Sequence, residues 1–198
     1  MMLFERKQYL QQLVSAENNR MIKIVTGIRR CGKSFLLFNI YKKHLLDRGV
    51  SADHIIEINL EDRRNKNLRD PDALLAYIDS RMKDSEKYFI LLDEIQLVPE
   101  FEDVLNSYLH IENAEVYVTG SNAKFLSKDV ITEFRGRGWE IRVRPLSFSE
   151  YYAGVGGDKR EALKNFYLYG GLPAVAQFEN PEDKQNYLKE IFETVYLK

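Results

Sequence analysis

Residues 27–34 read Gly-Ile-Arg-Arg-Cys-Gly-Lys-Ser, with the spacing G-x-x-x-x-G-K-S that is typical of phosphate-binding loops. Glycine at 27 and 32 tolerates backbone conformations that a side chain would hinder, so successive N–H groups can point at a polyphosphate. Lys33 is expected to reach the β- and γ-phosphates, and the Ser34 hydroxyl is expected to ligate Mg²⁺. The residues predicted to bind a nucleoside triphosphate are Gly27, Ile28, Arg29, Arg30, Cys31, Gly32, Lys33, Ser34 and Phe35.

The segments on either side of this loop fit the prediction. Residues 21–26 are rich in β-branched side chains, and from Ser34 to Gly49 apolar residues recur at helical spacing. Further strands are predicted at 54–60, 88–92, 116–119 and 139–143, and further helices at 4–14, from residue 71, at 100–110 and beyond Pro145. The alternation of strands and helices predicts an α/β fold with a parallel sheet, in which 139–143 alternates as an edge strand does.

Composition limits the class of protein. The chain has 198 residues, of which 44% are hydrophobic and 30% charged, and this predicts a soluble globular protein. No apolar run approaches the ~20 residues of a membrane span, and the N-terminus lacks a secretory signal. One cysteine excludes an internal disulfide and favours a cytoplasmic location. The net charge of −1 gives no general attraction to nucleic acid.

Two acids follow the apolar run 88–92. Asp93 is predicted to hold Mg²⁺ beside the phosphate loop, and Glu94 is predicted to take a proton from a water that attacks the γ-phosphate. The alternative is a strand end that meets solvent. Ser121 and Asn122 follow the next strand, where they could hydrogen-bond the water or the γ-phosphate; alternatively, Ser121 caps a helix.

Arginines flank the last predicted strand. Arg137, in the turn Arg135-Gly136-Arg137-Gly138, is predicted to stabilise transition-state charge in its own chain or across a subunit interface. A nucleic-acid contact is the competing function, because Arg142 and Arg144 extend the basic patch. For Arg135, Arg142 and Arg144 a solvated turn is the simpler interpretation. Histidines and cysteine show no metal-ligand spacing, so Mg²⁺ is the only metal expected.

Taken together, these motifs resemble AAA+-type P-loop ATPases, and more closely one bacterial and archaeal family of them. The motifs are Gly-Ile-Arg-Arg-Cys-Gly-Lys-Ser at 27–34, Leu-Asp-Glu-Ile-Gln at 92–96, Thr-Gly-Ser at 119–121, Gly-Arg at 136–137, Pro-Leu-Ser-Phe-Ser-Glu-Tyr at 145–151 and Gly-Gly-Leu-Pro at 170–173. The resemblance implies ATP and Mg²⁺ as cofactors, a five-stranded sheet of order 5-1-4-3-2 and a C-terminal helical lid. Members usually continue into a nuclease-like domain of unknown function, which is expected to be missing after Lys198.

The expected organisation is an N-terminal helix (1–20), an ATPase core (21–145) and a helical lid (146–198). The first functional hypothesis is Mg-dependent ATP hydrolysis coupled to conformational change. The alternative is an ATP-loaded switch that recruits a partner with little hydrolysis. A GTPase is disfavoured because Leu68 replaces the aspartate of a guanine-reading box, and a small-molecule kinase fits the Asp-Glu pair less well. A homo-oligomer and an unidentified protein partner are left open, and a membrane contact is not expected.

The single cysteine gives one further expectation. Cys31 sits among backbone amides that concentrate positive potential, which can lower the pKa of a thiol. Its thiol is therefore expected to be reactive and to be protected by bound ATP.

Overall fold

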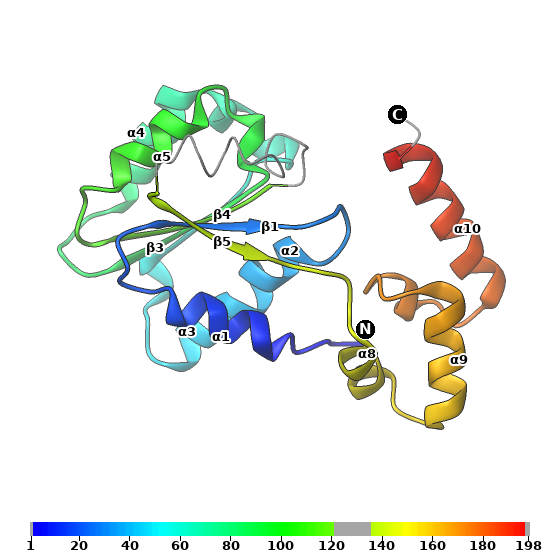
Figure 1. Ribbon diagram of the computed structural model, residues 1–198. Coiled ribbons are helices and arrows are strands. Elements are labelled where there is room, and N and C mark those ends of the chain that lie inside the picture. Colours follow the sequence, from blue (N-terminus) through cyan, green and yellow to red (C-terminus); the bar gives the residue numbers. More distant parts are fainter. Residues whose placement is uncertain (1, 121–135, 197–198) are drawn as a thin grey trace. The chain divides into compact units, whose positions relative to one another are not determined.

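The computed structural model describes residues 2–120 and 136–196. Five strands form one sheet in the order β2-β3-β4-β1-β5, and all four pairings are parallel (Figure 1). The strands are β1 (Ile22–Thr26), β2 (Ile55–Asn59), β3 (Tyr88–Asp93), β4 (Ala114–Thr119) and β5 (Gly138–Arg142). This arrangement confirms the predicted α/β fold, the order 5-1-4-3-2 and the edge position of β5.

The register of the strands determines which residues share an edge of the sheet. Leu92 pairs with Val118, and Val25 pairs with Thr119. Parallel pairing therefore brings the last residues of β1, β3 and β4 to one edge, and the loop after β1 leaves from that same edge. Ligands of open parallel sheets bind beyond this carboxyl edge.

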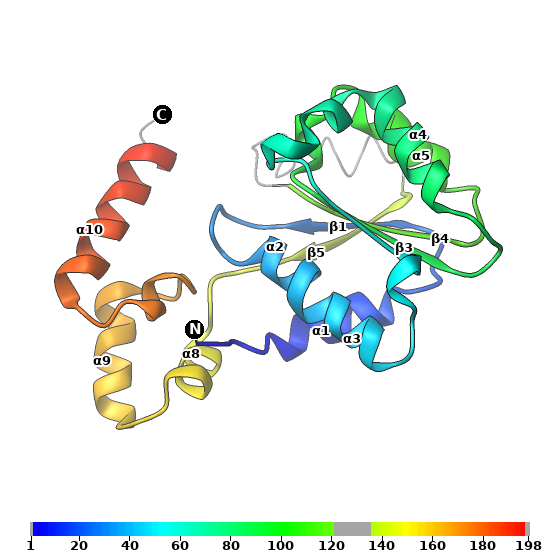
Figure 2. The same cartoon turned by 180° about the vertical axis from the view of Figure 1, so that it is seen from behind.

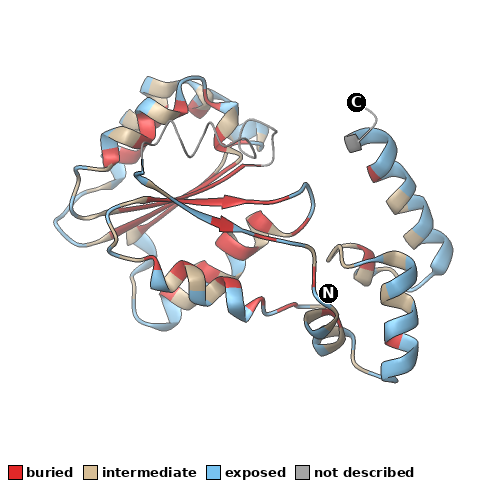
Figure 3. Cartoon of the chain, in the orientation of Figure 1, coloured by how far each residue is buried: buried red, intermediate tan, exposed pale blue. Residues whose placement is uncertain are grey.

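Helices cover both faces of the sheet, as Figures 1 and 2 show from opposite sides: α4 and α5 on one face, α1 to α3 on the other. They are α1 (Lys7–Ser15), α2 (Lys33–Phe35), α3 (Lys42–Asp47), α4 (Pro71–Arg81) and α5 (Phe101–Tyr108). Burial is concentrated in the strands and the inner helix faces (Figure 3). Every residue of β1 and of β3 is buried, as expected of strands with helices on both sides.

Three segments differ from the predicted elements. The helix predicted at 4–14 begins at Lys7, because Arg6 has a φ of 49° that no helix accepts. Between β2 and the helix predicted from residue 71 lies a 3₁₀ helix, Arg63–Arg69, where no helix is predicted from the sequence, and its first turn is capped by the Asp62 carboxylate. The helix after the phosphate loop is π-helical over Leu36–Tyr41, and this wider turn brings both of its end residues into the core.

The described chain forms two compact units. One comprises Gln8–Gly27 and Lys33–Arg142 and contains the sheet. The other comprises residues 2–7, Ile28–Gly32 and the chain from Val143 onward. The second unit contains α8 (Phe148–Val155), α9 (Lys159–Tyr169) and α10 (Pro181–Ile191).

A small apolar core holds the second unit together. Phe4 is buried there with Leu146, Tyr151 and Ala162. The N-terminal segment therefore belongs to this core. Gly171 also packs closely, because a Cβ at this position would lie 2.2 Å from the carbonyl oxygen of Leu146. Within residues 2–120 and 136–196, no helix has the length and apolar character needed to cross a membrane.

Candidate functional site

The phosphate loop has the backbone that its glycines predict. Gly27 has a φ of 145° and Gly32 a φ of 96°, both in the region that glycine adopts most readily. The loop also turns at Arg30, which has a φ of 65° and which the sequence did not mark as unusual. Lys33 begins α2 with 4% of its surface exposed, and its Nζ donates to the carbonyl oxygen of Gly27 at 3.1 Å. The ammonium group is thus held at Gly27, where the loop leaves β1.

Ser34, Asp93 and Thr119 form a hydrogen-bonded group at the carboxyl edge of the sheet. Asp93 is the last residue of β3, and 3% of it is exposed. Its carboxylate accepts hydrogen bonds from the Thr119 Oγ1 hydroxyl and from the Ser34 side chain. Ser34 and Asp93, predicted as the metal ligands, therefore lie together, and Thr119 joins them from the neighbouring strand.

Burial affects the charge of this group. Removal from water raises the pKa of Asp93 above its ordinary value, while the hydrogen bonds from Thr119 and Ser34 lower it. The negative charge of Glu94 raises the Asp93 pKa further, and the Lys33 ammonium lowers it. A cation at the Asp93 carboxylate would stabilise the ionised form. Bound positive charge would therefore stabilise this group of residues.

Glu94 follows Asp93 in a left-handed conformation, with φ 56° and ψ 48°. Its N–H donates to Thr119 Oγ1 at 3.0 Å, so one hydroxyl contacts both acids. The Glu94 carboxylate is half-buried and accepts a hydrogen bond from Gln96 Nε2. The two acids predicted from the sequence thus differ in their surroundings: Asp93 is buried, whereas Glu94 is half-buried and has a left-handed backbone.

The donor set fits a nucleotide with Mg²⁺. Mg²⁺ prefers oxygen ligands and is usually held by one or two protein groups together with substrate phosphates. The hydroxyl of Ser34 and the carboxylate of Asp93 are such a pair, and they are already in hydrogen-bond contact. Lys33 would supply positive charge to a polyphosphate bound next to this pair.

The outer part of the loop belongs to the second compact unit. Ile28, Arg29 and Arg30 are exposed, and the Arg30 guanidinium lies 5.0 Å from the centre of the Tyr187 ring on α10. Phe35, at the end of α2, is half-buried.

Cys31 requires a correction. Its thiol was expected to be reactive, but the residue is fully buried, and Sγ lies 3.5 Å from the carbonyl oxygen of Val143. A buried thiol of this kind is inert toward alkylating reagents, because the reagent cannot reach the sulfur.

Of the remaining predicted catalytic residues, Arg137 is in the described part of the chain. Ser121, Asn122 and Arg135 lie outside the described residues. Arg137 is exposed, and its carbonyl oxygen accepts a hydrogen bond from Ile22 N at 2.9 Å. It therefore precedes β5 at the starting edge of the sheet, about 15 Å of strand away from the edge that holds Asp93. This placement argues against contact with the phosphates of its own chain, and a role across an interface stays a prediction.

Two residues that sequence reasoning did not single out contact the acids. Thr119 is a polar residue that follows the run Val-Tyr-Val at 116–118, at the carboxyl end of its strand, which is a signal for a hydroxyl directed at a site. Gln96 belongs to the Leu-Asp-Glu-Ile-Gln motif. Its contact with the Glu94 carboxylate depends on the left-handed backbone of Glu94, which cannot be predicted from the residue type.

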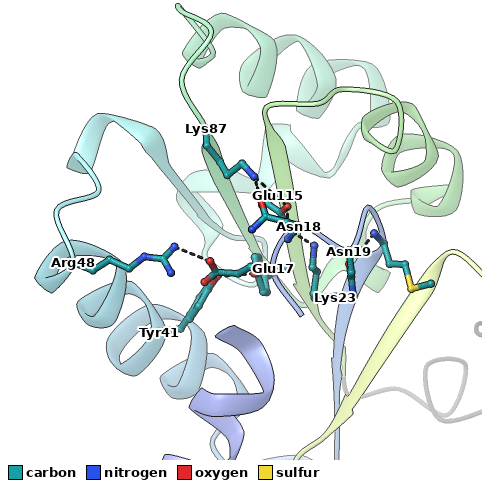
Figure 4. A network of polar contacts seen from close by, with 10 residues as sticks. Glu17, Asn18, Asn19, Lys23, Tyr41, Arg48, Lys87 and Glu115 are labelled. Carbon is teal, nitrogen blue, oxygen red and sulfur yellow. Dashed lines mark hydrogen bonds and ion pairs between the residues drawn. The ribbon is translucent and has the colours of Figure 1, made fainter. Parts of the chain in front are cut away.

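A second polar cluster lies at the opposite edge of the sheet (Figure 4). Lys23, near the start of β1, forms a buried ion pair with Glu115, near the start of β4. Burial lowers the pKa of Lys23, although Glu115 opposes this effect. Glu17 accepts a hydrogen bond from the Tyr41 hydroxyl at 3.0 Å and pairs with Arg48 at 2.8 Å. The cluster ties the turn before β1 to the sheet and to the helix that follows the phosphate loop.

Comparison with known proteins agrees with the observed fold. A family model described as "AAA domain" matches residues 19–152. An uncharacterized protein of Haemophilus influenzae is 33% identical over 201 residues, which cover 98% of this chain and 50% of that protein. An uncharacterized protein of Methanocaldococcus jannaschii is 31% identical, over 89% of this chain and 41% of that protein. The chain thus spans about half the length of these curated relatives, or less.

Solved structures share the fold at low sequence identity. The Aeropyrum pernix ORC1 protein, solved in complex with DNA, has a TM-score of 0.51 and 16% identity over 96% of this chain and 66% of its own. Domain III of the Thermotoga maritima replication initiation protein DnaA has a TM-score of 0.51 and 13% identity, over 95% and 83%. C. elegans PCH-2 has a TM-score of 0.52 and 16% identity, over 82% and 45%. At these identities the likeness shows the fold alone.

Proposed function

Because this chain belongs to the AAA domain family, we propose that it binds ATP with Mg²⁺ and hydrolyses it, using Glu94 as the general base. The observation that carries the proposal is the group at the carboxyl edge of the sheet. Ser34 and Asp93 are hydrogen-bonded there, and the next residue, Glu94, is left-handed and donates its backbone N–H to Thr119. A protein that only bound the nucleotide would have no need for the second, separately held acid.

Each residue has a defined task in this proposal. Lys33 and the loop amides bind the phosphates, and Ser34 and Asp93 hold Mg²⁺, which neutralises phosphate charge when it is bound. Glu94 accepts a proton from the attacking water. The water oxygen bonds to the γ-phosphorus as the bond to the β–γ bridging oxygen breaks, and ADP and phosphate leave.

The proposal extends to conformational coupling between the core (21–145) and the C-terminal helices (146–198). Its support lies within the second compact unit, where the phosphate loop contacts residues from the end of the chain. Arg30 lies over the Tyr187 ring, and a Cβ at Gly32 would be 3.7 Å from Pro173. A change in the loop on nucleotide binding would therefore reach those helices. Hydrogen exchange of α10 with and without Mg-ATP measures this coupling, and unchanged exchange would contradict it.

A single-turnover assay with excess protein tests hydrolysis. Glu94→Gln keeps the shape of the side chain but cannot accept the proton, so hydrolysis should slow by about 10²–10⁴-fold. ATP affinity measured by calorimetry should be retained. In Lys33→Ala, by contrast, ATP affinity should be lost.

Glu100→Gln is the matched control. Glu100 is also a left-handed glutamate, with a φ of 50°, and it is exposed at the start of α5. Its amide variant should hydrolyse ATP at the wild-type rate. If Glu94→Gln also kept that rate, Glu94 would not be the base, and an ATP-loaded switch that recruits a partner would be the better description.

A further inference from the structure

Gln96 faces the general base from the turn that follows β3. Its Nε2 donates a hydrogen bond to Oε2 of Glu94. The contact arises because the carbonyl oxygen of the left-handed Glu94 accepts the N–H of Leu97 at 3.0 Å. This bond closes the 3₁₀ turn Ile95–Leu97, which carries the glutamine side chain back over the carboxylate.

The turn that carries Gln96 is anchored on both sides. Ile95 is fully buried and Val98 is 1% exposed, and both belong to the main hydrophobic core. Thr119 binds the backbone N–H of Glu94 independently. The backbone and the carboxylate of Glu94 are therefore held by separate contacts, and Gln96 provides a contact to the carboxylate itself.

The amide of Gln96 has one orientation that suits this contact. An ionised carboxylate only accepts hydrogen bonds, so the amide presents its NH₂ group to it. The other end, Oε1, is buried, and no residue in the described part of the chain hydrogen-bonds to it. A buried acceptor without a donor costs stability, and an apolar side chain of equal length would avoid that cost. Packing therefore does not explain why residue 96 is a glutamine, whereas the hydrogen bond to the Glu94 carboxylate does.

We propose that Gln96 is a positioning residue for ATP hydrolysis, which keeps the Glu94 carboxylate in the rotamer that takes the proton. The inference rests on the proposed function of Glu94 as the base. Without the glutamine, the carboxylate loses one constraint on its rotamer, and fewer encounters with the water are productive. ATP affinity is unaffected, because the contact is to the base and the phosphate-binding groups lie on other elements.

Gln96→Met tests the proposal, since methionine has the same length and no hydrogen-bond donor. Single-turnover hydrolysis should fall on the order of 10-fold, with unchanged ATP affinity. The thermal midpoint should equal or exceed that of the wild type, because the unsatisfied oxygen is removed. A glutamine that served only to stabilise the turn would instead give a lower midpoint. Leu97→Met, on the same turn but at a side chain that is 37% exposed, is the control and should match the wild type in both measurements.

The double variant Glu94→Gln/Gln96→Met separates this proposal from the function on which it rests. Its hydrolysis rate should equal that of Glu94→Gln, because Gln96 acts only through Glu94. An additional loss in the double variant would overturn the positioning role. Wild-type turnover by Gln96→Met, with Glu94→Gln slow, would also overturn it and leave the base assignment standing. Wild-type turnover by Glu94→Gln would contradict both the base assignment of Glu94 and the positioning role of Gln96.

Discussion

Replacing Thr119 by valine should destabilise the protein and impair the site, although the side chain keeps its shape. The fully buried Thr119 hydroxyl donates to Asp93 and accepts from the Glu94 N–H. A hydrogen bond to a charged group contributes about 1.5–3 kcal/mol, and a buried N–H left without a partner costs about 1 kcal/mol or more. We therefore expect the free energy of unfolding to fall by about 3 kcal/mol, a large part of the ~5–15 kcal/mol of a typical domain.

Urea denaturation followed by Trp139 fluorescence measures this change. Trp139 is the only tryptophan of the chain, and it lies on β5 in the same compact unit as Thr119. Thr119→Ser is the matched control, because it keeps the hydroxyl and loses one buried methyl group, at a cost of about 1 kcal/mol. In the same samples, Thr119→Val should hydrolyse ATP more slowly than Thr119→Ser, since Glu94 loses the bond that holds its backbone. Equal unfolding free energies for the two variants would refute the role given to the hydroxyl.

Three further changes test other parts of the structure. Gly171→Ala should destabilise the C-terminal helices by about 3 kcal/mol in thermal melts followed by circular dichroism, because the new Cβ would lie 2.2 Å from a backbone oxygen. Lys23→Met should lower stability by about 3 kcal/mol, because the buried Glu115 would keep only the longer ion pair to Lys87, at 3.7 Å, whereas Lys23→Met with Glu115→Leu should restore most of it in urea denaturation. Arg137→Ala should keep ATP affinity and lose hydrolysis at high protein concentration, and mixing it with Lys33→Ala should restore activity if the arginine acts across an interface.

Each of these predictions has its own contradicting result. Gly157→Ala, where a Cβ has open space and only the φ of 75° is unfavourable, should cost only about 1 kcal/mol, so an equal loss in both glycine variants would contradict the steric argument. Full stability of Lys23→Met alone would mean that the buried pair is dispensable. Hydrolysis that does not depend on concentration, without rescue in the mixture, would remove the interface role of Arg137.

The sign of the pH effect at Lys23 follows from its burial. The Lys23 pKa in the folded protein is lowered from 10.5, so the unfolded chain binds more protons in the range just below that value. Wild-type stability should therefore gain from Lys23 as the pH rises toward 10.5, and Lys23→Met should lack that gain. Parallel slopes for the two proteins across this range would contradict the lowered pKa.

The sequence alone predicted the positions of those parts of the candidate site that lie in short continuous stretches. The phosphate loop, the strand before it and the acids after β3 lie in short continuous stretches, and the parallel order followed from a family resemblance. The burial of Cys31 could not be read in this way. It depends on Val143, which lies far along the chain, and residue type alone favours a reactive thiol in such a loop. The same holds for Thr119 and Gln96, whose contacts require a strand neighbour and a left-handed residue.

The direction of β5 determines at which edge of the sheet Arg137 lies, and motif matching does not use this information. In a parallel sheet, a residue that follows a strand lies at the carboxyl edge, and a residue that precedes a strand lies at the other edge. Asp93 ends β3, whereas Arg137 comes directly before β5, so parallel pairing alone separates them by the length of a strand. An arginine at the starting edge can meet a phosphate only if the phosphate belongs to another molecule. Because of the direction of β5, Arg137 can have a catalytic role only if copies of the chain assemble, whatever the conformation of the turn around it.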